Sequence, residues 1–426
     1  MSGVPNFGSG KMKMLWLCPE IPYPLTTGLL RVYSLLRELG QRHEITFVSI
    51  TRRREVQPES LQALAPFTKR VIVHSEWDSP EPFLLRVLKK VPYVGARVED
   101  GWRKRQVSRK ASRTLRDLAH NEEFDVVLFG GRYKIPGLKE LGLPIVVDCC
   151  DAHCARFLGE MQCAPLLRRP PIYLRYLLMK RSETKMARMS RYVSFISDRD
   201  RKALARSAAH TQILPQGVDF NFWKRSSRER ERGLLVFTGG LDYSPNDDAA
   251  RFLMREILPL VKRAVPGVRT VIVGRDPMPQ VLDAAANDPD ITVTGFVPDV
   301  RPYLERAEIY VAPLRFSSGV QNKVLEAMAM ELPVVTTPAV ADALVWDGEH
   351  APVLVAAGAR EIAETVIGLL HDEEKREELG RRGREFVVEH CRWSHSASIF
   401  ESMCAAAVSD RYAAGQDSSV HLEQCA

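Results

Sequence analysis

A strand, a loop of small residues and an amphipathic helix follow one another directly from residue 309 to residue 330, and a second apolar strand follows at 333–337. The loop is Ser317-Ser318-Gly319, and the helix carries Lys323 and Glu326. A small-residue loop at the start of a helix leaves backbone N–H groups free for an anion, which the helix dipole also attracts. The unit predicts a phosphate-binding edge of a parallel sheet. A plain strand–loop–helix with a surface Lys–Glu pair is the alternative interpretation.

Short β-rich runs alternate with helical patterns along the whole chain, which is typical of α/β proteins with parallel sheets. In the first half, strands are expected near 12–18, 44–50, 70–74, 125–129, 144–148, 192–197 and 211–214, with helices including 28–40 and 99–120. In the second half, strands are expected near 234–238, 269–274, 291–294, 309–313, 333–337 and 352–355, with helices near 246–264, 278–287, 319–330, 358–371 and 373–389. At 426 residues, the chain exceeds what one hydrophobic core usually serves, so two domains are expected.

A polar segment, KRSSRERER at 224–232, interrupts the alternation and is interpreted as an interdomain linker. It separates an N-terminal domain at 1–223 from a C-terminal domain at 233–392. An amphipathic helix is expected near 393–408, and the polar residues 409–426 are expected to form a flexible tail.

The composition is that of a soluble globular protein, with 45% hydrophobic and 27% charged residues. No run of 18 apolar residues is present, and the apolar run at 14–17 is too short for a signal peptide. Three of the eight cysteines, at 149, 150 and 154, cluster around His153 but lack paired C-x2-C spacing. Reduced, buried thiols in a cytoplasmic protein are therefore favoured over a zinc site.

The net charge of +7 is concentrated locally. Residues 168–191 contain eight Lys or Arg and one Glu, interleaved with large apolar residues, and a second basic stretch covers 84–98. Such segments suit an anionic membrane surface or nucleic acid. The sequence shows no helix-turn-helix or aromatic-and-basic RNA pattern, so no nucleic-acid partner is expected. The prediction is a cytoplasmic protein that contacts the inner membrane face through 168–191, with a solvated helix face as the alternative.

The block GVQNKVLEAMA, followed by PVV, resembles the donor-sugar motif of retaining glycosyltransferases with the GT-B fold, family 4, and in particular the exopolysaccharide-associated branch. The matching positions are Gly319, Gln321, Asn322, Lys323, Leu325, Glu326, Ala327, Met328, Ala329 and 333–335. Further segments follow in the family's order, including VVDCCDAH at 146–153, LPQGVDFNFW at 214–223 and FTGGLDYSPNDDAARFL at 237–253. The resemblance covers roughly 12–407.

The resemblance implies an α/β fold of two Rossmann-like, doubly wound domains facing across a cleft, with the helix at 393–408 crossing back to the first domain. It implies transfer of a hexosyl group, with retention of configuration, from a nucleotide-sugar donor to a glycan or lipid-linked acceptor. Exopolysaccharide or cell-surface glycan biosynthesis is the expected setting. No cofactor or metal is expected, because protein cations and a helix N-terminus take the place of Mg²⁺.

The resemblance also assigns candidate site residues. The candidate catalytic residues are Arg315, Lys323 and Glu326. The other candidate donor contacts are Gly239, Gly240, Arg275, Ser318, Gly319, Val320 and Asn322. The candidate acceptor-side residues are Gly28, Arg31, Asp151 and His153.

Several positions depart from the family pattern. The first Glu of E-x7-E falls at Ser318, and the Arg and Lys of a G-R-L-x-x-x-K-G loop fall at Gly240 and Pro245. The usual Asn before G-V-D is Gln216, and Leu29 replaces the second glycine of the first loop. A donor diphosphate must then be neutralised from elsewhere, with Arg315, Lys323 and Arg275 as candidates.

Two other functions stay open. One is a GT-B epimerase acting on a nucleotide-sugar. The other is a catalytically silent scaffold or binding subunit of a polysaccharide assembly complex, which the missing cations and carboxylate favour. A dinucleotide oxidoreductase is disfavoured, because no G-x-G-x-x-G follows the first strand of either half.

Overall fold

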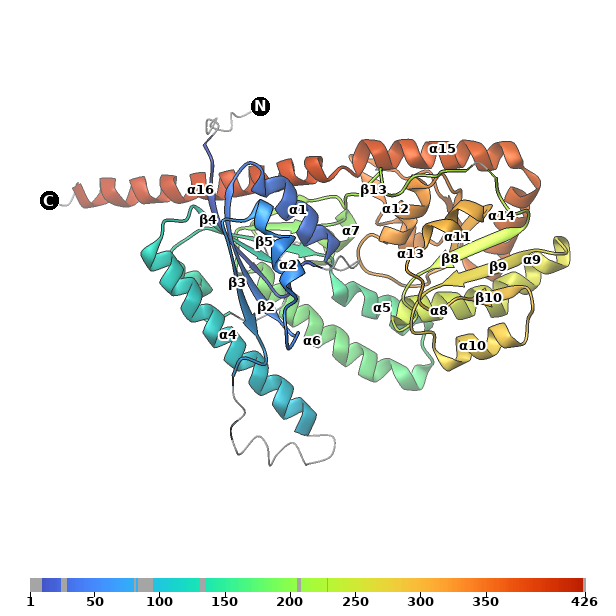
Figure 1. Cartoon of the computed structure of the whole chain (residues 1–426), viewed down its shortest axis with the longest axis horizontal. Coiled ribbons are helices and arrows are strands. Elements are labelled where there is room, and N and C mark those ends of the chain that lie inside the picture. Colours follow the sequence, from blue (N-terminus) through green and yellow to red (C-terminus); the bar gives the residue numbers. More distant parts are fainter. Residues whose placement is uncertain are drawn as a thin grey trace.

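The computed structural model of the chain describes residues 10–23, 29–79, 82, 95–130, 135–204, 208–227 and 229–423. Two parallel sheets, each covered by helices on both faces, make up two lobes placed side by side (Figure 1). The α/β fold predicted from the alternation of strands and helices is confirmed.

The N-terminal sheet has seven parallel strands in the order β3-β2-β1-β4-β5-β6-β7. These are β1 (Lys13–Cys18), β2 (Glu44–Thr51), β3 (Arg70–Ser75), β4 (Val126–Gly130), β5 (Ile145–Cys150), β6 (Tyr192–Phe195) and β7 (His210–Ile213). Almost every residue of β1 and β2 is buried, as expected for strands covered on both faces. The order reverses between β1 and β4, which is the doubly wound arrangement that binds ligands at the carboxyl ends of its strands.

Helices cover both faces of this sheet. They are α1 (Leu30–Gly40), α2 (Pro58–Gln62), α4 (Gly95–Asn121), α5 (His153–Cys163), α6 (Arg169–Ala187) and α7 (Asp198–Leu204), with the short 3-10 helices η1 (Ala65–Phe67), η2 (Leu138–Leu141) and η3 (Leu166–Arg168). Val107, Ala111 and Leu115 of α4 pack on one face, and Leu35, Leu36 and Leu39 of α1 pack on the other.

The C-terminal sheet has six parallel strands in the order β10-β9-β8-β11-β12-β15. These are β8 (Leu234–Thr238), β9 (Arg269–Val273), β10 (Ile291–Val293), β11 (Ile309–Ala312), β12 (Val334–Thr336) and β15 (Leu354–Val355); β13 (Val345–Trp346) and β14 (Glu349–His350) form a separate antiparallel pair. The helices are α8 (Ser244–Phe252), the π-helix η5 (Leu253–Ile257), α9 (Leu258–Ala264), α10 (Pro279–Ala286), α11 (Arg301–Arg306), α12 (Asn322–Ala329), α13 (Pro338–Ala341), α14 (Gly358–His371) and α15 (Glu373–His390).

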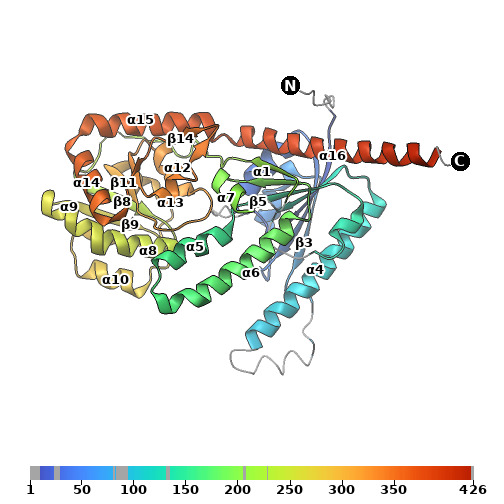
Figure 2. The ribbon, with the colours of Figure 1, turned by 180° about the vertical axis from the view of Figure 1, so that it is seen from behind.

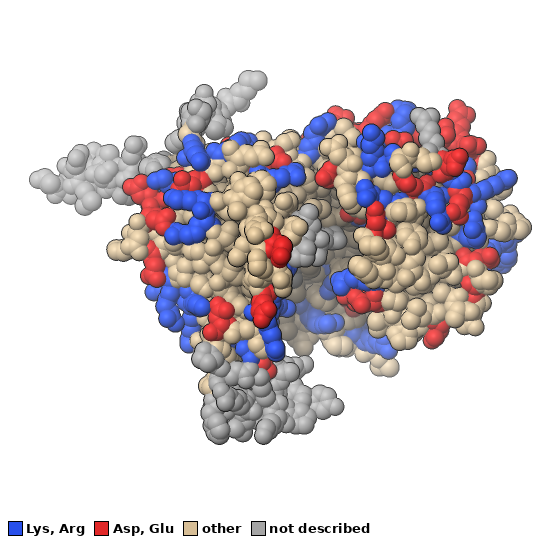
Figure 3. Space-filling model, viewed as in Figure 1, with Lys and Arg blue, Asp and Glu red and all other residues tan. Residues whose placement is uncertain are grey.

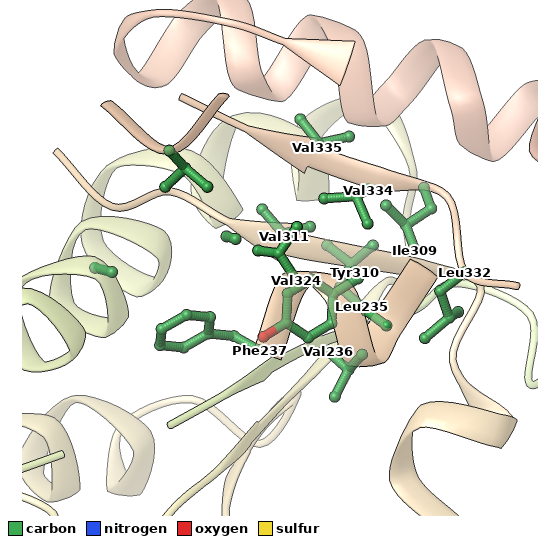
Figure 4. Close-up of a cluster of buried hydrophobic side chains, with 14 of the residues drawn as sticks. Leu235, Val236, Phe237, Ile309, Tyr310, Val311, Val324, Leu332, Val334 and Val335 are labelled. Atoms are coloured by element: carbon green, nitrogen blue, oxygen red, sulfur yellow. The ribbon is translucent and has the colours of Figure 1, made fainter. Parts of the chain in front are cut away.

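The core of this domain lies between the central strands and α12. Figure 4 shows Phe237 of β8, Tyr310 and Val311 of β11, and Val334 of β12 gathered around Val324 of α12. These side chains are at most 1% exposed. The helix that carries Lys323 and Glu326 is thus held rigidly by its apolar side.

The chain crosses between the two cores near residues 214–218, ahead of the polar segment 224–232. Leu214 packs in the first domain, whereas Val218 packs in the second and its N–H donates to the Cys391 carbonyl at 2.9 Å. The described parts of 224–232 lie on the second domain, where Arg230 donates to the Glu331 carbonyl at 2.8 Å. The physical reason is that Val218, with the apolar residues that follow it, joins the second core before the polar stretch begins.

The chain returns to the first domain at the start of its last helix, α16 (Trp393–Glu423). Trp393, Phe400 and Met403 pack in the same cluster as α1 and the strands beneath it. Here the structure differs from the expected tail at 409–426, because the helix continues to Glu423. The stretch contains no proline, and its one glycine costs a helix only about 1 kcal/mol.

Candidate functional site

The loops at the carboxyl ends of the two sheets meet between the lobes. The space-filling view shows a hollow between the lobes on this side of the molecule (Figure 3). The Ser318 hydroxyl, after β11, donates to Asp151 Oδ2, after β5, at 2.8 Å. Doubly wound domains bind ligands at such edges, so the hollow is the candidate site.

The loop before α12 places backbone N–H groups at this edge. Gly319 has a left-handed backbone with φ of 61°, and a Cβ atom there would lie 2.9 Å from the Asp151 Cβ. Only glycine permits this approach without strain. Gln321 precedes the helix and makes no side-chain cap, and Asn322 is its first residue. Val320 is buried beside them. The Val324 N–H donates to the Gln321 carbonyl at 2.8 Å. Among the described residues, the N–H groups of Asn322 and Lys323 are therefore the ones in the first turn of α12 that stay available for an anion.

Lys323 lies against the loop that follows β8. Its ammonium donates a hydrogen bond to Asn246 Oδ1, and Asn246 Nδ2 donates to the Gly240 carbonyl at 2.8 Å. A Cβ atom on Gly239 would lie 3.0 Å from Lys323 Nζ and 2.7 Å from Asn246 Nδ2. The bare backbone at Gly239 thus leaves room for the lysine beside both glycine loops.

Burial brings the pKa values of the two titratable groups of α12 close together. It lowers the pKa of the Lys323 ammonium to about 7 and raises the pKa of the Glu326 carboxyl to about 7, while the attraction between the two charges opposes both shifts. Among the described residues, the Glu326 carboxylate has no hydrogen-bond partner. A ligand that brings phosphate charge to Lys323 and hydroxyl groups to Glu326 would satisfy both side chains.

The other two predicted cations are paired. Arg315 makes two hydrogen bonds to Asp248 of α8, at 2.9 and 2.6 Å, and this carboxylate raises its pKa further. Arg275 is exposed and lies 3.2 Å from Asp276 and 3.8 Å from Asp242. Arg275 also lies beside the loop after β8, where a Cβ atom on Gly240 would be 3.6 Å from its Nε, whereas Lys323 is the cation beside Gly239 itself.

The predicted acceptor-side residues lie at different depths. Asp151 also contacts His153, with 2.8 Å between Oδ1 and Nε2, so these two residues and Ser318 form one cluster. Arg31 is buried and holds Asp148 at 2.8 and 3.1 Å. Its guanidinium is thus occupied within the first domain. Gly28 lies outside the described residues.

Three further residues reach across the cleft. Asp200 accepts hydrogen bonds from the N–H groups of Ala152 at 3.0 Å and Gly319 at 3.3 Å. Arg199 donates to the Gly319 carbonyl at 3.0 Å. The Arg156 guanidinium lies 5.1 Å from the centre of the Tyr243 ring.

Sequence reasoning missed all three residues. The charged run after β6, SDRDRKAL, was a usable signal for the first two. Arg156 had none, because its contact with Tyr243 is made across the two domains, beside its contact with the neighbouring Phe157 ring at 4.8 Å. Its Nε is buried and has no hydrogen-bond partner among the described residues, and it lies over the loop that lacks the family's Arg and Lys.

The clustered cysteines are free thiols. Cys149 and Cys154 are buried, and burial raises the pKa of the Cys154 thiol to about 12. A group of three or more His, Cys, Asp or Glu side chains able to hold a metal ion is not found within the described ranges. Within the same ranges, no helix is long and apolar enough to span a membrane.

Comparison with known proteins finds a family match within the second domain. Residues 232–372 match the family described as Glycosyl transferases group 1. A GDP-mannose-dependent alpha-(1-6)-phosphatidylinositol monomannoside mannosyltransferase of Mycobacterium tuberculosis is 26% identical over 232 residues. The match covers 48% of this chain, and the chain spans 59% of the length of that relative.

Solved structures resemble nearly the whole chain. Anabaena Alr3699/HepE in complex with UDP and glucose has a TM-score of 0.63 at 12% identity, covering 93% of this chain and 100% of that one. Sucrose-phosphate synthase from Thermosynechococcus elongatus has a TM-score of 0.62 at 13% identity, with the same coverage. TarM has a TM-score of 0.63 at 9% identity, covering 94% of this chain and 100% of that one. The chain has the GT-B fold, and residues 232–372 of its second domain match the group 1 glycosyl transferases.

Proposed function

We propose that this protein is a glycosyltransferase that moves a hexosyl group from a nucleotide-sugar to a glycan or lipid-linked acceptor, with retention of configuration. The observation that carries the proposal is the placement of Lys323 and Glu326 on α12, beside the Gly239 and Gly319 loops. This edge offers a cation, free N–H groups and an unbonded carboxylate together. A nucleoside diphosphate bound to a sugar has the matching groups.

The charge that develops on the leaving diphosphate would be stabilised from both domains. The first turn of α12 and Lys323 act from the second domain. Arg156 acts from the first domain and supplies a cation over the loop in which Gly240 and Pro245 stand for the family's Arg and Lys. Ser318, Gly319, Val320 and Asn322 line the diphosphate, and Glu326 accepts from sugar hydroxyls. In this proposal these groups take the role that a metal ion has in other transferases, so a chelator leaves the activity unchanged.

The acceptor would enter from the first domain, where Asp151 and His153 lie beside Ser318. The mycobacterial relative is named for a GDP-mannose donor and a phosphatidylinositol-linked acceptor. Together with the basic stretch 168–191, this supports a lipid-linked acceptor at an anionic membrane surface. Exopolysaccharide or cell-surface glycan biosynthesis is the proposed setting.

A panel of GDP- and UDP-hexoses tests the proposal by thermal shift, because a ligand of the folded state raises the melting temperature in proportion to its affinity. The donor that binds is then incubated alone and with lipid extracts. Slow hydrolysis alone and faster consumption with an acceptor are expected, with the anomeric configuration of the product read by NMR. Tight binding without turnover would identify a silent binding subunit, and interconversion of the donor would identify an epimerase.

A further inference from the structure

The outer side of α6 and of the preceding turn η3 carries an exposed apolar patch, which we call the leucine patch. Leu166, Leu167, Leu174 and Leu178 are 74%, 93%, 57% and 62% exposed. Within the described residues, Leu167 is the most exposed of the large hydrophobic side chains. Contiguous apolar patches on a protein surface mark sites of interaction with proteins, ligands or membranes.

A cavity of about 810 Å³ opens farther along the same helix, between the C-terminal half of α6 and the segment 135–140. Its cationic lining comes from one face of the helix and from η2, and consists of Lys139, Lys180, Arg181, Lys185 and Arg188. The lining contains one acidic residue, Glu140. Arg181, Lys185 and the C-terminal cap residue Arg188 follow one another at intervals of four and three, so their side chains point to the same side.

Most of this charge is not neutralised by the protein. Among the described residues, the side chains of Arg181, Lys185 and Arg188 make no ion pair or hydrogen bond. Lys139 donates to the Arg188 carbonyl at 3.2 Å, and Lys180 donates to the Tyr176 hydroxyl at 3.0 Å. Neither partner carries a compensating carboxylate.

Glu183, the one acidic residue within 168–191, does not offset these cations. It is buried and accepts hydrogen bonds from the N–H groups of His153 at 3.0 Å and Cys154 at 3.1 Å, at the start of α5. Its carboxylate therefore binds groups in the interior, and the charged side chains on the outer surface of α6 are all cations.

Leu138, Leu177 and Met189 add apolar surface to the same cavity. Leu177 is next in sequence to Leu178 of the leucine patch, so the apolar and cationic surfaces adjoin. We propose that the cavity binds the phosphate headgroup of an anionic membrane lipid while the leucine patch lies in the outer part of the same lipid layer. The inference rests on the membrane contact of the proposed function, and it adds the site, its ligand and the side of the protein that faces the membrane.

Phosphate is the chemistry that this set of cations recognises, and it is shared by a lipid headgroup and by soluble phosphate esters. The leucine patch favours the lipid, because a soluble ester would leave these side chains in water. Figure 2 shows α6 along the outside of the first domain, with its N-terminal end beside α8 and α10 of the second. A membrane along α6 thus reaches the boundary between the domains, where a lipid-linked acceptor would arrive.

Sedimentation of the full chain with vesicles tests the site. The vesicles contain phosphatidylcholine alone or with phosphatidylglycerol. The cavity variant is Arg181→Gln, Lys185→Gln and Arg188→Gln. The control variant removes three exposed cations from α14 and α15 of the other domain, as Arg360→Gln, Lys375→Gln and Arg382→Gln. Binding to the anionic vesicles is expected to fall roughly 100-fold in the cavity variant and to change little in the control.

A leucine variant, Leu167→Ser with Leu174→Ser, separates the two surfaces. It is expected to lose vesicle binding while sn-glycerol 3-phosphate still protects Lys185 from amine-reactive labelling. The single change Lys185→Glu is expected to weaken vesicle binding as well, which guards against misfolding of the triple variant. Binding of UDP and GDP is measured in every variant and should be unchanged, so the headgroup site and the transferase activity are judged separately.

Equal losses in the cavity and control variants would overturn the inference and leave net charge as the cause. Indifference of the natural chain to both vesicle types would overturn it too. If the natural chain bound glycerol 3-phosphate in the cavity but did not bind vesicles, the site would be assigned to a soluble phosphate ester instead of a lipid.

Discussion

The Ser318 hydroxyl of the second domain donates a hydrogen bond to the Asp151 carboxylate of the first domain, with 2.8 Å between the oxygens. Many relatives of the family resembled here carry a glutamate at position 318. In this chain a carboxylate is brought to the same place by the opposite domain. The replacement therefore changes which domain supplies the negative charge at this edge.

Ser318→Glu tests this relationship. Two carboxylates would then share the space beside Gly319, and their repulsion should destabilise the closed arrangement of the domains. A lower melting temperature is expected for Ser318→Glu, with recovery when Asp151→Asn is added. The less disruptive Ser318→Ala should cost only about 1 kcal/mol in the free energy of unfolding. Additive effects of Ser318→Glu and Asp151→Asn would show that the two positions do not interact.

Glu326→Gln is expected to weaken binding of the donor by about 1.5–3 kcal/mol, because a charge-assisted hydrogen bond to a sugar hydroxyl is lost. The fold should persist, since the apolar side of α12 is unchanged. Calorimetric titration with the donor measures the effect. Glu364→Gln on the outer side of α14 is the matched control. Unchanged affinity in Glu326→Gln would remove this residue from the site.

Most strands of the two parallel sheets were predictable because they are short apolar runs bounded by polar or turn residues, as in LLVFT of β8. The short antiparallel pair β13 and β14 was not predicted, because two-residue strands leave no such run. Parallel strands covered on both faces have to be apolar along their length. The chain joins the second core near Val218, before its most polar stretch begins. Composition marks where a chain is exposed, whereas the contacts of single apolar residues decide where a domain begins.

The site residues were predictable only where residues that act together lie close together in the sequence. Lys323 and Glu326 share one helix, and the glycine loops adjoin their strands. By contrast, Arg315 is bound to Asp248, which lies 67 residues earlier in the chain. Arg156 meets a loop of the other domain. No spacing or periodicity carries such information. The first pair is set by how α8 packs beside the loop after β11 within the second domain, and the second by how the two domains face each other.

The charged pair on α12 predicts an unusual dependence of stability on pH. The pKa of Lys323 lies below its unfolded value, so above about pH 7 the unfolded state binds more protons and stability rises with pH. The pKa of Glu326 lies above its unfolded value, so between about pH 4.5 and 7 the folded state binds more protons and stability falls as pH rises. The pair should therefore be most costly near pH 7.

Urea unfolding of the natural chain and of Lys323→Met with Glu326→Gln tests this at pH 5, 7 and 9. The variant should gain most relative to the natural chain near pH 7, while it loses donor binding at every pH. A stability difference that does not vary with pH would contradict the assigned shifts. A functional pair that lowers stability is typical of binding sites.

Arg315 and Lys323 should respond differently to the same change. Arg315→Met leaves the buried Asp248 without its principal partner, so loss of stability is expected as the main effect. Lys323→Met should instead lower turnover more than donor affinity, because the diphosphate charge that it meets grows in the transition state. Melting curves and steady-state kinetics of both variants decide this. If Arg315→Met folded stably but lost turnover, Arg315 would have to be counted among the catalytic residues.

Arg156→Gln tests whether the first domain supplies the missing cation. The guanidinium lies over Tyr243, its Nε is buried, and no carboxylate among the described residues pairs with it. If it meets the leaving diphosphate only when the domains are closed, kcat should fall by about 10- to 1000-fold, as when one preorganised donor is removed, with a smaller change in donor affinity. Arg156→Lys should restore part of the activity, because the charge is kept while the planar group is lost. Arg113→Gln, on the exposed side of α4, is the control for loss of one charge. Equal activity of Arg156→Gln and Arg113→Gln would show that the diphosphate is neutralised by Lys323 and α12 without help from the first domain.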